Sequence, residues 1–153
     1  DLTRSLSDSL LKFSAKVVLE NDNLWFCPTC QGLRCAVKRV VFSNVPEVLI
    51  IQLNRWSVKP ANPTQFCKND AKIKIMNHET VSVVVDPEIS FSQRLRPMSA
   101  ICHTGSFDRG HYYTYSRHGD SWYKFNDSAV CKVPGNLAYF SSKDPYVVFL
   151  RKV

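Results

Sequence analysis

Two segments of this 153-residue chain contain residue types that could act together in a nucleophilic active site. In the first, Gly110 precedes His111, and an imidazole can accept and return a proton, although such a histidine can also be purely structural. In the second, Asn126 follows His111 by 15 residues. An asparagine can orient an imidazole and fix its tautomer, as the third member of a catalytic triad does. Asp127 is a further candidate, and the alternative is that Asn126 and Asp127 only make a turn.

A predicted hairpin positions these residues. The strands expected over 111–116 and 122–125 flank residues 117–121, which have turn composition. A hairpin with its tip near residue 119 would bring His111 and Asn126 side by side on adjacent strands.

His103 lies eight residues before His111, across a loop that contains two glycines. It is a second candidate functional histidine, and the alternative is that it holds the loop by hydrogen bonds.

A separate motif, Cys27-Pro-Thr-Cys30, has metal-ligand spacing. Two cysteines at this spacing can hold one metal ion from a single turn, but a structural zinc site needs four ligands. The other four cysteines of the chain are isolated, so the pair is half a site. The alternative is two unliganded thiols in a turn.

The remaining pattern indicates one α+β body in which β-structure dominates. Leucines at near-helical spacing, after a capping serine at Ser5, predict a short N-terminal helix over residues 3–13. Two stretches, 57–70 and 86–97, contain prolines and are expected to be a loop and an irregular segment. Further strands are expected over 37–42, 47–56, 71–76, 81–85, 98–103 and 146–150.

Composition limits the partners and the compartment. The chain is 44% hydrophobic and 22% charged, which argues against wholesale disorder. No stretch approaches the length of a membrane span, which needs about 18 consecutive apolar residues. The net charge of +7 favours acidic partners, but the basic residues form no stripe, so nucleic-acid binding is disfavoured. Without a signal peptide, we expect an intracellular protein of the cytoplasm, the nucleus or both, without disulfides.

Taken in order, the motifs resemble those of the ubiquitin-specific proteases, which are papain-like cysteine deubiquitinases. That family has a His-x-Gly segment, a variable loop, Gly-His-Tyr, and then Trp-x-x-Phe-(Asn/Asp)-Asp. Residues 103–105, 110–112 and 122–127 match these motifs in turn. Three further segments also resemble the family. Residues 19–30 look like its second zinc-ligand pair, residues 46–56 like its leucine-rich strand followed by Lys-Arg-Phe, and residues 145–150 like its final strand.

The resemblance implies a papain-like fold and a division of roles. His111 would be the general base that activates a cysteine thiolate, Asn126 would orient it, and Asp127 would support the histidine or the transition state. The residues implied in binding the ubiquitin C-terminal tail are Gly110, Tyr112 and His103.

The chain departs from the family in its nucleophile. The family's cysteine lies in an early Asn-x-Cys box, which none of the six cysteines matches. We therefore expect residues 1–153 to be the C-terminal part of one catalytic domain: one N-terminal helix, a fingers portion over about 14–45, and a mostly antiparallel β palm over about 46–153. The helical thumb with the nucleophile, and the cysteine pair that would complete a zinc site with Cys27 and Cys30, would lie on a preceding segment.

The implied function is a thiol-dependent deubiquitinase that hydrolyses the isopeptide bond after the C-terminal glycine of ubiquitin. Its partners would be ubiquitin or a ubiquitin-like modifier and the N-terminal half of the catalytic domain. Two alternatives remain open: an inactive relative that binds ubiquitin or a ubiquitin-like modifier, and a protease for such a modifier. A zinc-finger nucleic-acid binder is disfavoured by the missing ligand pair.

Overall fold

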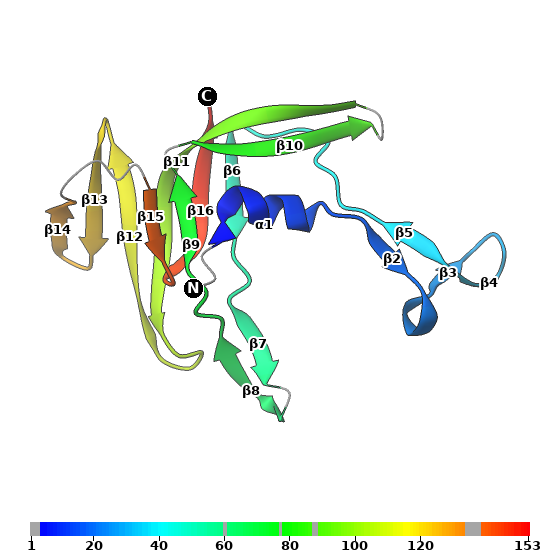
Figure 1. Cartoon of the computed structure of the whole chain (residues 1–153). Helices are drawn as coiled ribbons and strands as arrows, with labels where there is room; N and C mark the ends of the chain where they lie inside the picture. Colours follow the sequence, from blue (N-terminus) through cyan, green and yellow to red (C-terminus); the bar gives the residue numbers. More distant parts are fainter. Residues whose placement is uncertain (1–3, 60, 77, 87–88, 134–138) are drawn as a thin grey trace.

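The computed structural model describes residues 4–59, 61–76, 78–86, 89–133 and 139–153. A seven-stranded antiparallel sheet dominates this part of the chain (Figure 1), in the order β14-β13-β12-β11-β16-β6, with β10 paired to β11. Its strands are β6 (Val48–Gln52), β10 (Glu79–Asp86), β11 (Ile89–Gly105), β12 (Gly110–His118), β13 (Ser121–Asn126), β14 (Ala129–Lys132) and β16 (Pro145–Lys152).

Smaller sheets surround the large one. A three-stranded sheet joins β1 (Arg4–Ser5), β9 (Ile73–Met76) and β15 (Tyr139–Ser142). Three ribbons pair β2 (Val17–Leu19) with β5 (Ala36–Lys38), β3 (Trp25–Cys27) with β4 (Gly32–Arg34), and β7 (Trp56–Lys59) with β8 (Asn62–Lys68). A short 3-10 helix, η1 (Asn21–Asn23), precedes β3.

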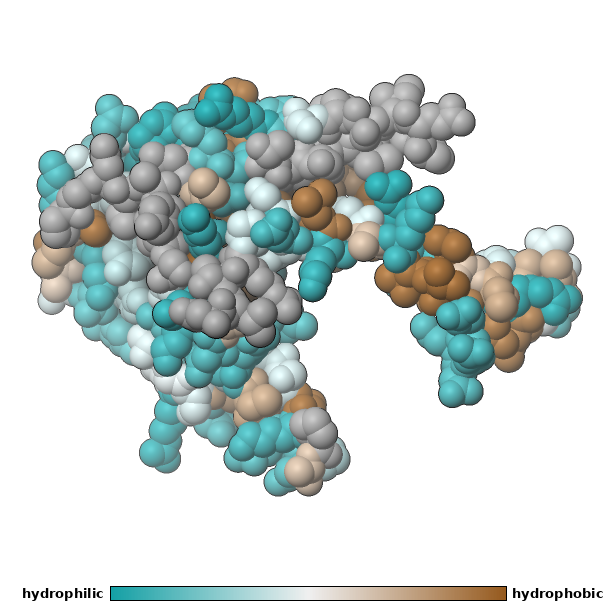
Figure 2. Space-filling view, viewed as in Figure 1, coloured by the Kyte–Doolittle hydropathy of each residue, from teal (hydrophilic) through white to brown (hydrophobic). Residues whose placement is uncertain are grey.

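The ribbons β2–β5 and β3–β4 extend away from the main sheet (Figure 1), and they lie within the predicted fingers portion. Their apolar side chains are poorly covered: Trp25 is 46% exposed, and Phe26 and Val37 are more exposed still. Figure 2 shows this apolar surface on the projecting arm. The division of the chain into fingers and palm stays a prediction.

The α-helix, α1 (Leu6–Phe13), begins where the sequence predicts a cap. The Ser5 side chain accepts a hydrogen bond from the backbone N–H of Asp8 at 2.9 Å. This bond satisfies one of the N–H groups that a helix start leaves without a partner. The helix predicted over 3–13 is confirmed from Leu6 onward, whereas Thr3 lies outside the described residues. None of the helical segments in the described part of the chain has the length and hydropathy that crossing a membrane requires.

Buried apolar side chains from α1, β9, β11 and β16 form one core. This core fixes β11 and β16, and the outer strands β12 and β13 extend the same sheet from β11. The predicted α+β architecture is therefore confirmed. The core side chains are Leu6, Leu10, Val45, Ile73, Ile75, Leu95, Ala100, Val148 and Leu150.

Two stretches predicted without regular structure are strands. Residues 57–70 hold most of the β7–β8 hairpin, where Pro63 lies in a two-stranded ribbon that does not require every N–H to be paired. Residues 89–97 belong to β11, and Pro97 lies at a shift in its register with β16. Such a bulge accommodates a residue that has no N–H to donate. Pro87 lies outside the described residues.

Other boundaries also differ. The strand predicted over 37–42 ends at Lys38, and the strand predicted over 47–56 is divided between β6 and β7. Six short strands were not predicted from the sequence: β1, whose two residues were expected to be helical, and β2, β3, β4, β14 and β15.

Candidate active site

The hairpin that the sequence predicts is present. Strands β12 and β13 pair from Thr114–Phe125 to His118–Ser121, and Gly119 in the turn has a φ of 58°, which suits glycine. The ladder ends at Thr114–Phe125, so His111 and Asn126 lie beyond its last pair.

His111 and Asn126 contact each other directly. The Nε2 atom of His111 lies 2.5 Å from Oδ1 of Asn126. A carbonyl oxygen only accepts hydrogen bonds, so Nε2 donates, and the neutral imidazole then carries its lone pair on Nδ1. The His111 side chain is 48% exposed, so a group supplied from outside can approach it. The pair can therefore act as a general base whose tautomer is fixed.

Asp127 has two structural features. Its φ of 52° is left-handed, and it lies in the turn between β13 and β14, whereas Asn126 is the last residue of β13. Its Oδ2 atom also lies 3.8 Å from Nε2 of His111. Because this carboxylate is 79% exposed, water screens its attraction for a protonated imidazole.

Gly110 allows the approach of two strand ends. A Cβ built at Gly110 would lie 2.0 Å from Nε2 of His103 and 2.6 Å from the carbonyl oxygen of Thr104, so no other residue fits without displacement. His103 itself is only 5% exposed and packs against the rings of Trp56 and Tyr112. Burial, together with the Lys68 ammonium, lowers the pKa of His103 and favours the neutral form.

The three residues predicted to bind the substrate tail thus occupy different environments. Gly110 and Tyr112 are exposed, Tyr112 to 57%, whereas His103 is buried beneath Gly110. Their role in binding a substrate stays a prediction.

The loop before Gly110 is held by aromatic rings that the sequence analysis did not single out. Phe107 stacks on Phe66 of β8 with ring centroids 4.3 Å apart, and the edge of Trp56 meets Phe107 at 5.3 Å. The β7–β8 ribbon therefore supports the loop that leads into His111. The prediction of residues 57–70 as a loop concealed this contact.

All six cysteines are free, and none of their sulfur atoms lies within hydrogen-bonding reach of His111 in the described structure. Cys102 is fully buried, and burial raises the pKa of its thiol to about 12. Cys131 is exposed on β14, opposite Lys124 of β13. The described residues thus hold the His111–Asn126 pair without a cysteine thiol in contact with it.

Cys27 and Cys30 lie together at the β3–β4 turn. The backbone N–H of Cys30 donates to Sγ of Cys27 at 3.4 Å, and this bond lowers the pKa of the Cys27 thiol. A thiolate is the form that ligates metal, so the environment suits a ligand pair. Across the described residues, no group of three or more His, Cys, Asp or Glu is placed to hold a metal ion.

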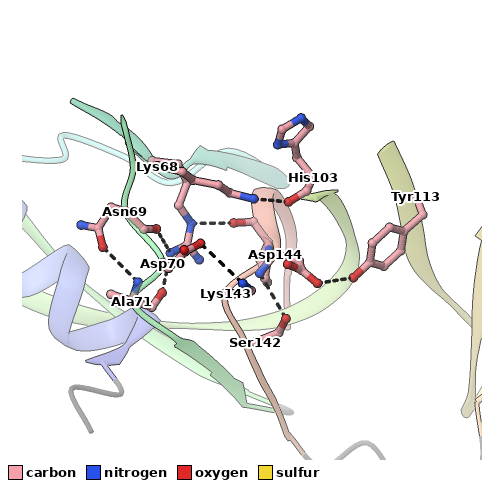
Figure 3. A network of polar contacts seen from close by, with 11 residues as sticks. Lys68, Asn69, Asp70, Ala71, His103, Tyr113, Ser142, Lys143 and Asp144 are labelled. Carbon is pink, nitrogen blue, oxygen red and sulfur yellow. Dashed lines mark hydrogen bonds and ion pairs between the residues drawn. The ribbon is translucent and has the colours of Figure 1, made fainter. Parts of the chain in front are cut away.

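A polar network behind the site was also missed (Figure 3). Asp144 accepts a hydrogen bond from the Tyr113 hydroxyl at Oδ2, 2.7 Å away, and from the His103 backbone N–H at its main-chain oxygen, 2.8 Å away. Lys68 donates to the His103 carbonyl. No local signal marks Asp144 as a link to β11 and β12, because Tyr113 and His103 lie 31 or more residues away in the sequence.

Arg55 extends the same region. Its buried guanidinium donates to the carbonyl oxygens of Pro145, Asn69 and Ala71. It therefore joins the chain after β8 to the start of β16. The arginine was part of the strand motif noted in the sequence, but its carbonyl partners were not predictable from that motif.

Comparisons with known proteins identify the family of the chain. The sequence profile described as "Ubiquitin carboxyl-terminal hydrolase" matches residues 13–150. Probable ubiquitin carboxyl-terminal hydrolase 4 of Schizosaccharomyces pombe is 31% identical over 97% of this chain, which covers 26% of that protein. A probable ubiquitin carboxyl-terminal hydrolase of Acanthamoeba polyphaga mimivirus is 30% identical over 93% of this chain, which covers 30% of it. The chain thus spans less than a third of the length of these two relatives.

Solved structures show the same fold. A chain of the SAGA Ubp8/Sgf11/Sus1/Sgf73 DUB module bound to ubiquitin aldehyde has a TM-score of 0.79 at 22% identity, covering 98% of this chain and 34% of that one. A chain of the yeast SAGA DUB module with a mutant Sgf73 also gives 0.79 at 22% identity, covering 98% of this chain and 33% of that one. The profile match over most of the chain, together with this papain-like α+β fold, shows that the chain belongs to the ubiquitin carboxyl-terminal hydrolase family.

Proposed function

We propose that the polypeptide containing this chain is a thiol-dependent deubiquitinase, which hydrolyses the isopeptide bond after the C-terminal glycine of ubiquitin. This chain supplies the His/Asn part of a Cys-His-Asn triad. The observation that carries the proposal is the 2.5 Å contact between His111 Nε2 and Asn126 Oδ1. Family membership supports the reaction class, and a relative in the solved structures is bound to ubiquitin aldehyde.

The proposed mechanism follows from the imidazole tautomer. A cysteine thiol on a segment outside residues 1–153 transfers its proton to Nδ1 of His111, and the thiolate attacks the glycine carbonyl. The imidazolium then returns the proton to the departing lysine amine, leaving a thioester. Water, deprotonated by the same imidazole, hydrolyses the thioester and releases the glycine carboxylate and the thiol. Asn126 holds the ring through both steps, and Asp127 faces the transient positive charge.

The approach to the base suits a narrow substrate. Two glycines end the tail of ubiquitin, and a backbone without side chains can pass close to Gly110. Tyr112, 57% exposed, offers an aromatic wall beside it. We therefore assign Gly110 and Tyr112 to the tail channel, with His103 as the buried support beneath them.

Cys27 and Cys30 are proposed as two of four ligands to a structural zinc ion, which would stabilise the fingers. The other two would come from the preceding segment. The location of the whole protein in the cytoplasm or nucleus stays a prediction.

The test is covalent labelling of the complete polypeptide with C-terminal electrophilic probes of ubiquitin and of a ubiquitin-like modifier, read as the mass of each modified peptide. A ubiquitin adduct on a cysteine outside residues 1–153 is the expected result. Labelling only by the second probe would keep the mechanism and change the substrate. An adduct on Cys102 or Cys131 would contradict the division of the site. No labelling of folded protein would identify an inactive relative.

A pair of matched variants tests the base. His111→Gln should lower turnover by about two to four decades, because a general base typically contributes that much. His118→Gln removes an exposed imidazole at the far end of the same strand and should leave turnover unchanged. Equal rates in the two variants would refute the role of His111.

A further inference from the structure

We infer that Tyr113 and Asp144 form a positioning pair, which fixes His111 relative to Asn126. The inference rests on the proposed function, and it assigns a role to two residues outside the triad. Neither residue touches the reacting atoms, so both act through the strand that carries His111.

Asp144 fixes two adjacent strands at once. Its main-chain oxygen accepts the His103 N–H of β11, and its carboxylate accepts the Tyr113 hydroxyl of β12. Its own N–H donates to Oγ of Ser142 at 3.1 Å, which orients the residue. Figure 3 shows these contacts converging on Asp144 from different elements. The two strands are thereby held together two residues after His111 of β12.

The environment of the pair keeps the tyrosine hydroxyl on the Asp144 carboxylate. In the described structure that hydroxyl donates to Oδ2 of Asp144, whereas the other carboxylate oxygen, Oδ1, is buried without a hydrogen-bond partner, so losing the bond from Tyr113 would leave both oxygens without a donor. Burial and the bond to Asp144 raise the pKa of Tyr113, so its hydroxyl remains a proton donor. The bond is therefore maintained across the pH range in which an imidazole titrates.

Tyr113 also connects the strand of His111 to the strand of Asn126. The Lys124 ammonium of β13 lies 4.3 Å from the centroid of the Tyr113 ring. Tyr113 is two residues after His111 in β12, so these two side chains lie on the same face of that strand. Lys124 is two residues before Asn126 in β13, so the same holds for them. The ring is thus held at its hydroxyl by Asp144 and at its face by Lys124.

This connection matters because backbone pairing between β12 and β13 ends at Thr114–Phe125. Beyond that pair, side-chain contacts set the distance between His111 and Asn126. Misplacing a catalytic group by about 1 Å can cost roughly a hundredfold in rate. A ring anchored on both strands limits that displacement.

The kinetic test compares Tyr113→Phe and Asp144→Ala in the complete polypeptide. Each should lower kcat about tenfold with little change in KM, because orientation and not substrate binding is lost. Asp144→Asn keeps an acceptor oxygen and should recover most of the rate. The double variant should lose no more than Asp144→Ala alone, because both changes remove one bond. Tyr123→Phe, the same deletion on β13, is the matched control and should behave as wild type.

A second readout does not depend on activity. It is nuclear magnetic resonance of protein whose histidines carry isotope labels at Cε1 and at both ring nitrogens. The His111 signals are assigned by their absence from His111→Gln. They report the tautomer of the ring and the pH midpoint of its titration. Tyr113→Phe should shift both, and Tyr123→Phe should shift neither. The inference would be overturned if Tyr113→Phe and Asp144→Ala lowered the melting temperature but left the His111 signals and kcat like those of Tyr123→Phe. Shifted signals in a polypeptide with no deubiquitinase activity would support the pair while the proposed function fails.

Discussion

At the scale of single residues, the Asn126 carbonyl determines which nitrogen of His111 is free. Replacing Asn126 by Ala removes the acceptor 2.5 Å from Nε2, so the ring can rotate and change tautomer. We expect kcat/KM for a ubiquitin–fluorophore substrate to fall by about ten- to a hundredfold, within the range of general-base catalysis. Asn126→Asp keeps an acceptor and should lose less. Equal losses in the two variants would show that the carbonyl has no orienting role.

The Cys102 thiol provides a second residue-scale prediction. Burial raises its pKa to about 12, so at pH 8 only about one thiol in ten thousand is ionised, and the thiolate is the reactive form. We expect iodoacetamide to modify the exposed Cys35 and Cys131 of the native protein and to spare Cys102 until the protein unfolds. Peptide mass spectrometry over a time course measures this. Early modification of Cys102 would mean that its site opens readily.

At the scale of elements, the turn from β11 into β12 depends on a close approach at Gly110. In Gly110→Ala the new methyl group would overlap the His103 ring and the Thr104 carbonyl oxygen. We expect the free energy of unfolding to fall by about 3 kcal/mol, typical of severe overpacking, with loss of turnover. Gly119→Ala is the control, because a Cβ at this position would meet nothing within 4 Å. This substitution should lower the free energy of unfolding by only about 1 kcal/mol, the cost of a left-handed backbone at an alanine. Urea unfolding of both variants measures the difference, and similar values would contradict the close-approach argument.

The elements also show why part of the site could be predicted from the sequence. Ser5, which caps α1, and Gly119, which turns the β12–β13 hairpin, act on residues close to them in the chain, so local pattern located the helix and the His111–Asn126 pair. Pro97 led to the wrong prediction of an irregular segment over 86–97, because a proline has no N–H to donate to a strand ladder. A bulge against β16 accommodates it, and no local pattern reveals that bulge. Asp144 was missed for the same reason, since the Tyr113 hydroxyl that it binds belongs to another strand.

At the scale of the whole molecule, the His111–Asn126 pair lies on a large sheet, whereas the apolar side chains of the two projecting ribbons, β2–β5 and β3–β4, are exposed. The core lies among α1, β9, β11 and β16, and its members do not include Trp25 and Phe26, which are exposed on the ribbons. Ribbons of two strands are marginally stable on their own. We therefore expect the fingers to depend on an additional constraint, and a metal ion at the β3–β4 turn is the constraint that the cysteine chemistry favours.

Zinc content of the complete polypeptide tests this dependence. Two thiolates leave a tetrahedral site open, so tight binding requires a second ligand pair from elsewhere in the polypeptide. We expect one zinc ion per molecule by elemental analysis, and its loss in Cys27→Ser and Cys30→Ser with a lower melting temperature. Cys35→Ser, an exposed cysteine outside the motif, should keep both values. A chelator should lower the melting temperature of the wild type and have little effect on Cys27→Ser. If Cys27→Ser retains its zinc and its stability, the metal is bound elsewhere and the ribbons are stabilised by packing alone.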